Sequence, residues 1–361
     1  MSLESFLDGF EERDWRTAPD GAGPIRFAFV GAGWWTRDHA IPAARTSTLC
    51  EPAVVVSSST EKAERVAAEN GLTTGITYEQ FHDGAAAAEY DAVYVCTPNA
   101  LHLQQAEAAA ELGKAVLCEK PMEATAERAD RMVEVAEAAD VPLMIAYRMH
   151  TEPSIRRMRE LVRSGAIGEP AQLIGWMLQP LLEMIPDPDQ WRLNPDLAGE
   201  GGSVTDLGVY PINTARFVLD RDPVAVTAQT VSTSEGYGSV PDERAAFTLE
   251  YEGGVLASYA ASQNAGNTGG FRVVGTEGSI THEPAFFQEA ERTLTLQRGD
   301  TEAEVSYDRP DQMTEEFTYF ADRLLADEPI EPDGAHGALD VRTIEAVYEA
   351  ARRGRRVAVD R

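Results

Sequence analysis

Lysine is scarce in this chain of 361 residues, where only Lys62, Lys114 and Lys120 occur. Lysine and arginine together number 31 against 60 acidic residues, which gives a formal net charge of −29. Such a chain repels phosphate backbones and anionic lipids, so we expect neither nucleic acid nor membrane as a partner. The acidic residues are spread along the chain, with no acidic tail. A dispersed acidic surface that avoids lysine is typical of adaptation to high salt, where screening relieves self-repulsion.

Cysteine is also rare, and long apolar runs are absent. Cys50, Cys96 and Cys118 form no CxxC pair and have no metal-ligand spacing. We therefore expect buried free thiols of a cytoplasmic protein, and no metal site. No apolar run approaches the length of a membrane span. Because the N-terminal residues have neither a basic start nor a hydrophobic stretch, we expect no secretory signal.

The order of strand-like and helix-like segments predicts two domains, as the length also suggests. Up to about residue 150, apolar strand-like segments alternate with helix-like ones, which predicts a doubly wound parallel α/β sheet. These strands are expected near 26–30, 53–56, 91–96, 115–121 and 141–147. Beyond about residue 165 strand-like segments follow one another, which predicts a largely antiparallel, open-faced sheet in an α+β domain. These are expected at 171–178, 224–233, 244–251, 254–262 and 271–275.

We divide the chain accordingly into three parts. Residues 1–23 are expected to form a peripheral helix and loop. Residues 24–150 are expected to form a dinucleotide-binding domain, and residues 151–361 a substrate-binding domain. The last helices, near 312–325 and 338–351, are expected to pack back on the first domain.

The first strand ends in Gly31-Ala-Gly33, at the turn into a helix. Glycines at such a turn let backbone N–H groups approach a pyrophosphate at the helix N-terminus. The pattern departs from GxGxxG, because Thr36 occupies the third glycine position and Trp34 and Trp35 fill the loop. We assign the two glycines and the two tryptophans to the cofactor site, and expect the tryptophans to pack there rather than to take part in catalysis.

The end of the second strand discriminates between nicotinamide cofactors. NAD-specific sites usually place an acid there to bind the ribose hydroxyls. Here the strand ends in Ser57, Ser58 and Ser59, with Lys62 close behind. Hydroxyls and one cation suit a 2′-phosphate, so the sequence favours NADP over NAD. Alternatively the hydroxyls only cap the next helix, a role that we expect for Thr60.

Lys120 stands in Glu119-Lys120-Pro121, directly after a short apolar strand. The carboxyl edge of a parallel sheet is where ligands bind in open α/β folds. A lysine at that edge that meets a nicotinamide and a sugar hydroxyl can assist proton removal during hydride transfer. Taken alone, the same lysine is better interpreted as an ordinary surface residue.

Asp206 and Tyr210 follow two glycines and are four residues apart, so on a helix they share one face. A phenol ordinarily has a pKa of about 10, so a catalytic tyrosine needs a nearby cation to favour its phenolate. Lys120 is the candidate cation, and Asp206 is a candidate to hold a substrate hydroxyl or to orient the other two groups. Taken singly, Asp206 is interpreted equally well as a helix cap, and Tyr210 is interpreted equally well as a packed side chain.

Together these segments resemble the glucose–fructose oxidoreductase and inositol dehydrogenase family over the chain after residue 24. Five motifs carry the resemblance, in the family's order: Gly31-Ala-Gly33 with His39, Thr97-Pro98-Asn99 with His102, Glu119-Lys120-Pro121, Asp206-x-Gly208-x-Tyr210, and Val274-Gly-Thr-Glu-Gly278. Many members have histidine where this chain has Tyr210. The tyrosine version resembles the branch with glucose–fructose oxidoreductase and dihydrodiol or xylose dehydrogenases. Within it, the sequence most resembles the NADP-dependent D-xylose dehydrogenases of halophilic archaea, in the segments Ile145–His150 and Pro186–Arg192 and in its acidic composition.

The resemblance implies oxidation of D-xylose at C1 to D-xylonolactone, with hydride transfer to NADP, as the first step of oxidative pentose breakdown. It implies that Tyr210 is the base, that Lys120 stabilises its phenolate and that Asp206 fixes the sugar. The implied residues around the cofactor also include Thr97, Pro98, Asn99, His102, Glu119 and Lys120. The implied substrate residues also include Tyr147, Arg148, Trp191 and Arg192. The Lys120–Pro121 peptide is expected to be cis.

Two other functions stay open. One keeps the chemistry and changes the substrate to another aldose or a dihydrodiol. The other is a non-catalytic nicotinamide-binding regulator, which the loss of lysine, aspartate or tyrosine would have favoured. In each case we expect a small-molecule ligand, and a homodimer or homotetramer formed through the sheet of the second domain.

Overall fold

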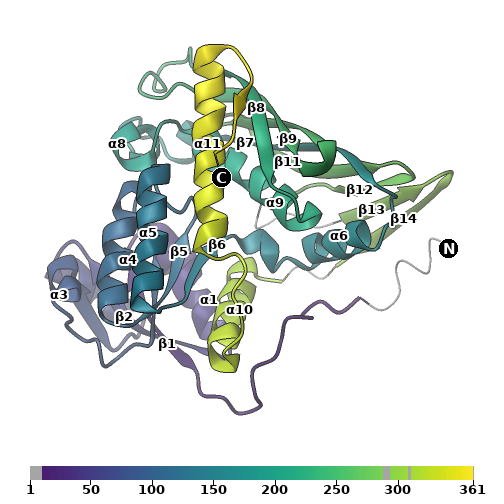
Figure 1. Cartoon of the computed structure of the whole chain (residues 1–361). Coiled ribbons are helices and arrows are strands. Elements are labelled where there is room, and N and C mark those ends of the chain that lie inside the picture. The colour runs from purple at the N-terminus through teal and green to yellow at the C-terminus, as the bar shows by residue number, and fades with distance from the viewer. Residues whose placement is uncertain (1–9, 288–292, 308–309, 361) are drawn as a thin grey trace. The chain divides into compact units, whose positions relative to one another are not determined.

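The computed structural model describes residues 10–287, 293–307 and 310–360. The chain divides into two compact units (Figure 1). The parallel-sheet unit comprises Trp15–Arg148 and Pro310–Val341. The large-sheet unit comprises Met149–Arg309, Arg342–Arg361 and the residues before Trp15. The division falls within the long helix α11 (Gly334–Arg353), so this helix contributes residues to both units.

The parallel-sheet unit is built on six strands in the order β3-β2-β1-β4-β5-β6. Every pairing in it is parallel, and the order reverses at the β1–β4 pair, so the predicted doubly wound sheet is confirmed. The strands are β1 (Ile25–Val30), β2 (Cys50–Ser57), β3 (Thr74–Thr77), β4 (Ala92–Val95), β5 (Ala115–Glu119) and β6 (Leu143–Ala146). The strand β3 was not predicted, because it is short and only its Ile76 is buried.

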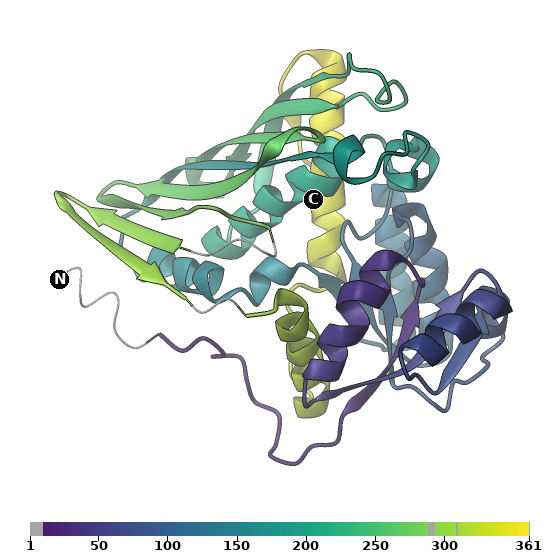
Figure 2. The same cartoon turned by 180° about the vertical axis from the view of Figure 1, so that it is seen from behind.

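Helices cover both faces of this sheet (Figures 1 and 2). On one face α4 and α5 pack against each other, and on the other α1 packs against α10. The helical segments are η2 (Thr36–Ala40), α1 (Ile41–Thr46), α2 (Thr60–Glu69), α3 (Tyr78–His82), η3 (Asn99–Leu101), α4 (His102–Glu111), α5 (Ala126–Ala139), η4 (Arg148–His150) and α10 (Gln312–Ala326).

Aromatic side chains hold α10 against the sheet. The Phe317 ring lies 5.1 Å from that of Phe27 and 5.0 Å from that of Tyr94, and Phe29 lies 5.8 Å from Tyr94. All four side chains are buried. Because such rings bury large areas in edge or tilted contacts, they fix α10 against β1 and β4.

The large-sheet unit contains nine strands in the order β14-β13-β12-β11-β7-β10-β9-β8-β15. All its pairings are antiparallel except that of β10 with β7, so the largely antiparallel sheet is confirmed. The strands are β7 (Pro170–Pro180), β8 (Pro223–Val231), β9 (Arg244–Tyr251), β10 (Leu256–Ser262), β11 (Asn264–Gly275), β12 (Gly278–His282), β13 (Thr293–Arg298), β14 (Thr301–Ser306) and β15 (Val357–Ala358). The strands β12, β13 and β14 were not predicted, because their sequences are rich in Thr, Ser, Gln and Glu.

Helices cover one face of the large sheet. The helix α9 (Val209–Leu219) packs against α6 (Pro153–Arg163) and against β7. Gly175 of β7 permits this approach, because a Cβ at that position would lie 2.8 Å from the Cβ of Pro211 in α9. No helix was predicted at α6. The shorter helical segments are α7 (Leu181–Met184), η5 (Trp191–Leu193), α8 (Pro195–Ala198), η6 (Val204–Gly208) and η7 (Glu252–Gly254).

The described part of the expected peripheral segment, residues 10–23, forms turns and no helix, and residues 1–9 lie outside the described ranges. Within the parallel-sheet unit, the Asp322 carboxylate accepts hydrogen bonds from the backbone N–H groups of Thr17 and Ala18 at 3.1 and 2.8 Å. The Trp15 ring packs edge-on against Tyr319 of α10. Among the described helices, none is long and apolar enough to cross a membrane.

Candidate active site

The turn after β1 has the geometry of a nucleotide-binding loop. Gly31 has a φ of +109°, and a Cβ there would lie 2.1 Å from the carbonyl oxygen of Cys96, so only glycine fits. At Gly33 a Cβ would have no neighbour within 4 Å, so its backbone faces open space. A continuous helical stretch, which includes η2 and α1, starts at Trp34. The glycine motif therefore leads the backbone to a helix N-terminus, where an anionic phosphate is favoured.

The end of β2 presents hydroxyl groups. The Ser57 hydroxyl is buried and has no hydrogen-bond partner among the described residues, whereas Ser58 is exposed. The side chain of Ser59 accepts a hydrogen bond from the backbone N–H of Lys62 and caps α2. The prediction that Thr60 caps this helix was therefore wrong by one residue, because Ser59 has the extended backbone of an N-cap while Thr60 is already helical.

Glu119 links the glycine loop to the strand that precedes Lys120. Its Oε1 accepts hydrogen bonds from Trp35 Nε1 at 3.2 Å and from the Tyr94 hydroxyl at 2.5 Å. Its Oε2 accepts one from the backbone N–H of Lys120 at 3.2 Å. The Lys120–Pro121 peptide is cis, as predicted. Glu119 therefore orients the loop and the lysine backbone through hydrogen bonds within the protein.

The segment after β4 is fixed by His102. Its Nε2 lies 2.9 Å from the carbonyl oxygen of Thr97 and its Nδ1 lies 3.1 Å from that of Met122, and the ring is fully buried. Thr97 and Asn99 are buried as well, and the Thr97 hydroxyl has no hydrogen-bond partner in the described ranges. His102 therefore joins the loop after β4 to the loop that follows Lys120, while Pro98 is the N-cap residue of the short helix η3.

Tyr147 and Arg148 follow β6 and both are buried. The Arg148 guanidinium donates a 2.7 Å hydrogen bond to Oε1 of Gln312 in α10, and the Tyr147 ring lies 6.4 Å from that of His336. Within the parallel-sheet unit these two side chains therefore contact the C-terminal helical segments.

Glu316 is a buried acid that sequence reasoning missed. Its carboxyl oxygens have no hydrogen-bond partner among the described residues. Burial, reinforced by the charge of Glu119 and only partly offset by Arg148, raises the pKa of Glu316 well above its usual range. Burial therefore favours the protonated form of this carboxyl group more than it would in an exposed glutamate. No sequence signal identified Glu316, because the sequence of α10 has the pattern of an ordinary amphipathic helix.

In the large-sheet unit, Asp206 lies in η6 and two donors address the same carboxylate oxygen. Gln263 Nε2 donates to Oδ2 at 2.9 Å, and Arg192 Nε lies 3.6 Å from that oxygen. The side chains of Asp206 and Arg192 are each 21% exposed. The Arg192 guanidinium also lies over the Trp191 ring at 4.5 Å. Asp206, Arg192 and Trp191 thus form one polar and aromatic group that sequence reasoning identified, and Gln263 is a member that it missed.

Tyr210 lies one helical turn after Asp206 and is the second residue of α9. Its side chain is largely buried, and its ring lies 5.9 Å from that of Phe286. The π-helical segment η6 runs into α9, so Asp206 and Tyr210 lie on one continuous helical stretch.

Asp242, and not Asp206, caps this helical stretch. Its carboxylate accepts backbone N–H groups from Gly202 at 2.7 Å, Ser203 at 2.9 Å and Val204 at 2.7 Å. Burial raises the pKa of Asp242 in spite of these donors. The suggestion that Asp206 is the cap was wrong, because the cap comes from a residue close in space but distant in sequence. The only sign of Asp242 in the sequence is that another acid, Glu243, follows it directly.

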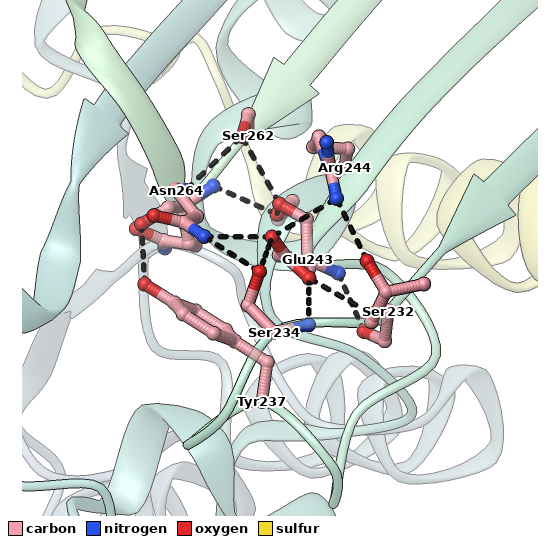
Figure 3. Close-up of polar contacts among 10 residues, drawn as sticks. Ser232, Ser234, Tyr237, Glu243, Arg244, Ser262 and Asn264 are labelled. Atoms are coloured by element: carbon pink, nitrogen blue, oxygen red, sulfur yellow. Dashed lines mark hydrogen bonds and ion pairs between the residues drawn. The ribbon is translucent and has the colours of Figure 1, made fainter.

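Glu243 joins the ends of three strands (Figure 3). Its carboxylate accepts hydrogen bonds from the backbone N–H groups of Thr233 and Ser234, from the Ser234 hydroxyl and from Asn264 Nδ2, and it pairs with Arg244 at 3.2 Å. Burial alone would raise the pKa of Glu243, but these donors outweigh it and lower the pKa to about 2. Glu243 thus remains ionised and fixes the strand ends that surround Gln263.

The parallel-sheet unit contains the elements that a dinucleotide needs: a glycine turn with open backbone, a helix N-terminus and hydroxyl groups at the end of β2. The large-sheet unit contains an accessible carboxylate held by an amide and a guanidinium, which suits a polyhydroxylated ligand. In the described ranges no group of three His, Cys, Asp or Glu side chains is arranged to hold a metal ion.

Both parts of the chain match models of known protein families. Residues 25–147 match "Oxidoreductase family, NAD-binding Rossmann fold" and residues 155–281 match "GFO/IDH/MocA C-terminal domain". A D-xylose 1-dehydrogenase of Haloarcula marismortui, whose name specifies NADP(+), is 52% identical over 97% of this chain and 98% of its own length. A second such enzyme from Haloferax volcanii is 33% identical over 93% of this chain and 100% of its own length.

Solved structures show the same fold. The aldose–aldose oxidoreductase from Caulobacter crescentus, solved with glycerol, superimposes with a TM-score of 0.86 at 30% identity over 93% of this chain and 99% of that one. The 52% identity along nearly the full length, together with the two family models, shows what kind of protein this is. The chain belongs to the GFO/IDH/MocA family of oxidoreductases.

Proposed function

We propose that this protein oxidises D-xylose at C1 to D-xylonolactone with NADP as the hydride acceptor, as the first step of oxidative pentose breakdown. The observation that carries the proposal is the 52% identity, over 97% of the chain, to a haloarchaeal D-xylose 1-dehydrogenase named for NADP(+). Lys120, Asp206 and Tyr210 stand at the positions of the family motifs, which favours an enzyme over a regulator.

NADP supplies a nicotinamide ring that accepts the hydride from C1 of the sugar. The open backbone at Gly33 would lie beside the pyrophosphate, after the turn that Gly31 permits. Ser57, Ser58 and Lys62 would bind the 2′-phosphate.

The loops after β4 and β5 would line the nicotinamide ribose. We assign contacts to Pro98, Asn99 and Lys120, and a supporting role to His102, because its ring nitrogens face two loop carbonyls. Glu119 would act through the Trp35 indole that it holds. Thr97 and Trp34 complete the set of residues assigned to the cofactor.

The protein residues would handle the proton of the C1 hydroxyl. Tyr210 would accept this proton as the base, and the Lys120 ammonium would stabilise its phenolate. Asp206, held by Arg192, would accept hydrogen bonds from sugar hydroxyls, and Trp191 would stack on the sugar ring. Tyr147 and Arg148 would support the rim of the site from the end of β6.

Steady-state kinetics with a panel of aldoses, NADP and NAD at molar salt test this proposal. We expect D-xylose with NADP to give the highest kcat/KM. We expect Lys120→Ala to lower kcat by about a thousandfold while NADP still binds. Lys114→Ala is the matched control, because Lys114 donates to the carbonyl oxygen of Tyr90 before β5 begins. Unchanged turnover in Lys120→Ala would remove Lys120 from the mechanism, and an absence of sugar oxidation by the wild type would favour the regulator.

The NADP assignment has its own test. Lys62→Ala is expected to lower kcat/KM for NADP about tenfold, with little effect on NAD, because only NADP carries the 2′-phosphate. Arg65→Ala is the control, since this exposed arginine lies one turn further along α2 and pairs with Glu69. A wild-type kcat/KM that is higher with NAD contradicts the assignment.

A second candidate function keeps the hydride chemistry and takes another aldose. The similarity to an aldose–aldose oxidoreductase, at 30% identity over 93% of the chain, favours it. The same aldose panel decides between the two, because it ranks sugars by kcat/KM. A dihydrodiol in the panel tests the remaining alternative.

We further propose a homodimer or homotetramer formed through the uncovered face of the large sheet. Ile174, Val231 and Leu256 share one face by strand register and are 43%, 47% and 44% exposed. Exposed apolar side chains on one sheet face favour a protein interface. Light scattering of Ile174→Asp should show a smaller assembly than the wild type. The low cysteine content, three residues in the whole chain, supports a cytoplasmic location.

A further inference from the structure

Gln263 connects β10 to β11 and is fully buried, although glutamine is usually exposed. Its Nε2 donates to Oδ2 of Asp206 at 2.9 Å and lies 3.3 Å from the carbonyl oxygen of Gly202. Its amide group therefore spans the first turn of the helical stretch that carries Asp206. An ionised carboxylate only accepts hydrogen bonds, so an amide N–H is a matched partner.

The orientation of this amide is set by a second glutamine. Gln179 Nε2 donates to Oε1 of Gln263 at 2.8 Å. Because Oε1 accepts this hydrogen bond, Nε2 is the atom that faces Asp206. A reversed amide would place two amino groups together and an oxygen against a carboxylate, so both ends of the side chain resist a flip.

The backbone of Gln263 is held from several sides. Its N–H donates to the carbonyl oxygen of Glu243 at 3.1 Å and to Ser203 Oγ at 3.0 Å. Its carbonyl oxygen accepts the Tyr237 hydroxyl at 2.7 Å. The neighbouring Asn264 is anchored to the Glu243 carboxylate (Figure 3). The amide therefore sits on a rigid support, as positioning a carboxylate within a fraction of an ångström requires.

We propose that Gln263 is a positioning residue for the substrate, which sets the orientation of the Asp206 carboxylate toward sugar hydroxyls. This inference rests on the proposed function, in which Asp206 binds the sugar. Gln263 and Arg192 address the same oxygen of Asp206 from different segments, one neutral and one charged. The Arg192 guanidinium stabilises the negative charge of the Asp206 carboxylate, and the Gln263 amide fixes the direction in which this carboxylate points.

Two substitutions of Gln263 separate positioning from packing. Gln263→Met keeps the length of the side chain and removes its donor, so the KM for D-xylose should rise about tenfold while the KM for NADP stays unchanged. Gln263→Glu places a second carboxylate against Asp206, so kcat/KM for D-xylose should fall further, by about a hundredfold. Gln297→Met, on the exposed side of β13, is the matched control and should behave as the wild type.

The outcomes distinguish this inference from the proposed function. A wild type that oxidises D-xylose, with a Gln263→Met variant of unchanged sugar KM, overturns the inference alone. A variant that loses kcat and thermal stability in parallel, with sugar KM unchanged, also overturns it, because Gln263 then serves only packing. A wild type that oxidises no aldose overturns the proposed function and this inference with it.

A variant that leaves Gln263 in place covers the case in which Gln263→Met does not fold. Gln179→Met removes only the group that orients the amide, so the sugar KM should rise several-fold, less than expected for Gln263→Met. An unchanged sugar KM in Gln179→Met would then overturn the inference.

Discussion

The Tyr348 hydroxyl donates a 2.7 Å hydrogen bond to Oδ2 of Asp242, a residue 106 positions earlier in the chain. The same carboxylate accepts the backbone N–H groups of Gly202 and Val204, at the start of the helical stretch that carries Asp206. A side chain of α11 therefore supports the element that presents the candidate substrate carboxylate.

Tyr348→Phe should destabilise the protein, because it leaves the buried Asp242 carboxylate with one donor fewer. We expect the free energy of unfolding to fall by about 2 kcal/mol, measured by denaturant titration at high salt. Tyr90→Phe is the matched control, because the buried Tyr90 hydroxyl has no hydrogen-bond partner among the described residues. Its free energy of unfolding should change by less than about 0.5 kcal/mol. Equal losses in the two variants would contradict the role of the hydrogen bond.

Gly31→Ala and Gly33→Ala should separate folding from cofactor binding. At Gly31 a methyl group meets the Cys96 carbonyl oxygen at a positive φ, so we expect a loss of about 3 kcal/mol in unfolding free energy. At Gly33 the methyl group has open space, so the melting temperature should stay unchanged. The dissociation constant for NADP should nevertheless rise about tenfold, because the pyrophosphate approaches this backbone. Tight NADP binding by Gly33→Ala would remove Gly33 from the cofactor site.

Elements with their own local pattern could be predicted, and the parallel sheet is the clearest case. Its buried strands are short apolar runs bounded by polar, glycine or proline residues, so all except β3 were found. The strands β12, β13 and β14 have too few apolar residues to show their alternation. Their identity comes from antiparallel pairing across the sheet, which a single segment does not reveal.

The residues of the candidate site divide in the same way, into those that a local sequence motif predicts and those that only the fold brings to the site. Asp206 and Tyr210 stand in a recognisable motif, but their supports come from distant segments. Asp242 caps a helical stretch that starts about forty residues earlier in the chain. Gln263 reaches Asp206 from the junction between β10 and β11. Such partners are chosen by tertiary packing, because a buried polar group must find a donor wherever the fold provides one. The sequence therefore predicts the groups that would meet the ligand better than those that hold them.

Glu316→Gln should change how stability depends on pH. The pKa of Glu316 in the folded protein lies well above its ordinary value, so the acid favours folding fully only below its unfolded pKa, near 4.5. As pH rises toward the folded pKa this contribution is lost, because the buried carboxyl resists ionisation. The glutamine variant lacks this loss, so its stability relative to the wild type should grow from about pH 5 to pH 8. Denaturant titrations across that range measure it.

An exposed acid serves as the control for this pH dependence. Glu302→Gln, on β14, should keep a constant difference from the wild type over the same range, since Glu302 lies in solvent. A Glu316→Gln variant whose difference from the wild type is also constant with pH would show that Glu316 does not titrate as a buried acid.

High salt should stabilise the protein by screening its own charge. With a net charge of −29, acidic side chains repel one another across about 10 Å at 0.1 M salt but only about 3 Å at 1 M. We therefore expect a higher melting temperature in about 2 M KCl than in about 0.1 M KCl.

On the edge strand β14, Glu302 and Glu304 are both exposed and point to the same side of the strand. Glu302→Lys should raise the melting temperature at low salt and have little effect at high salt, whereas Thr301→Ser, which changes no charge, should have little effect at either. A gain from Glu302→Lys that is equal at both salt concentrations would contradict screening as the cause.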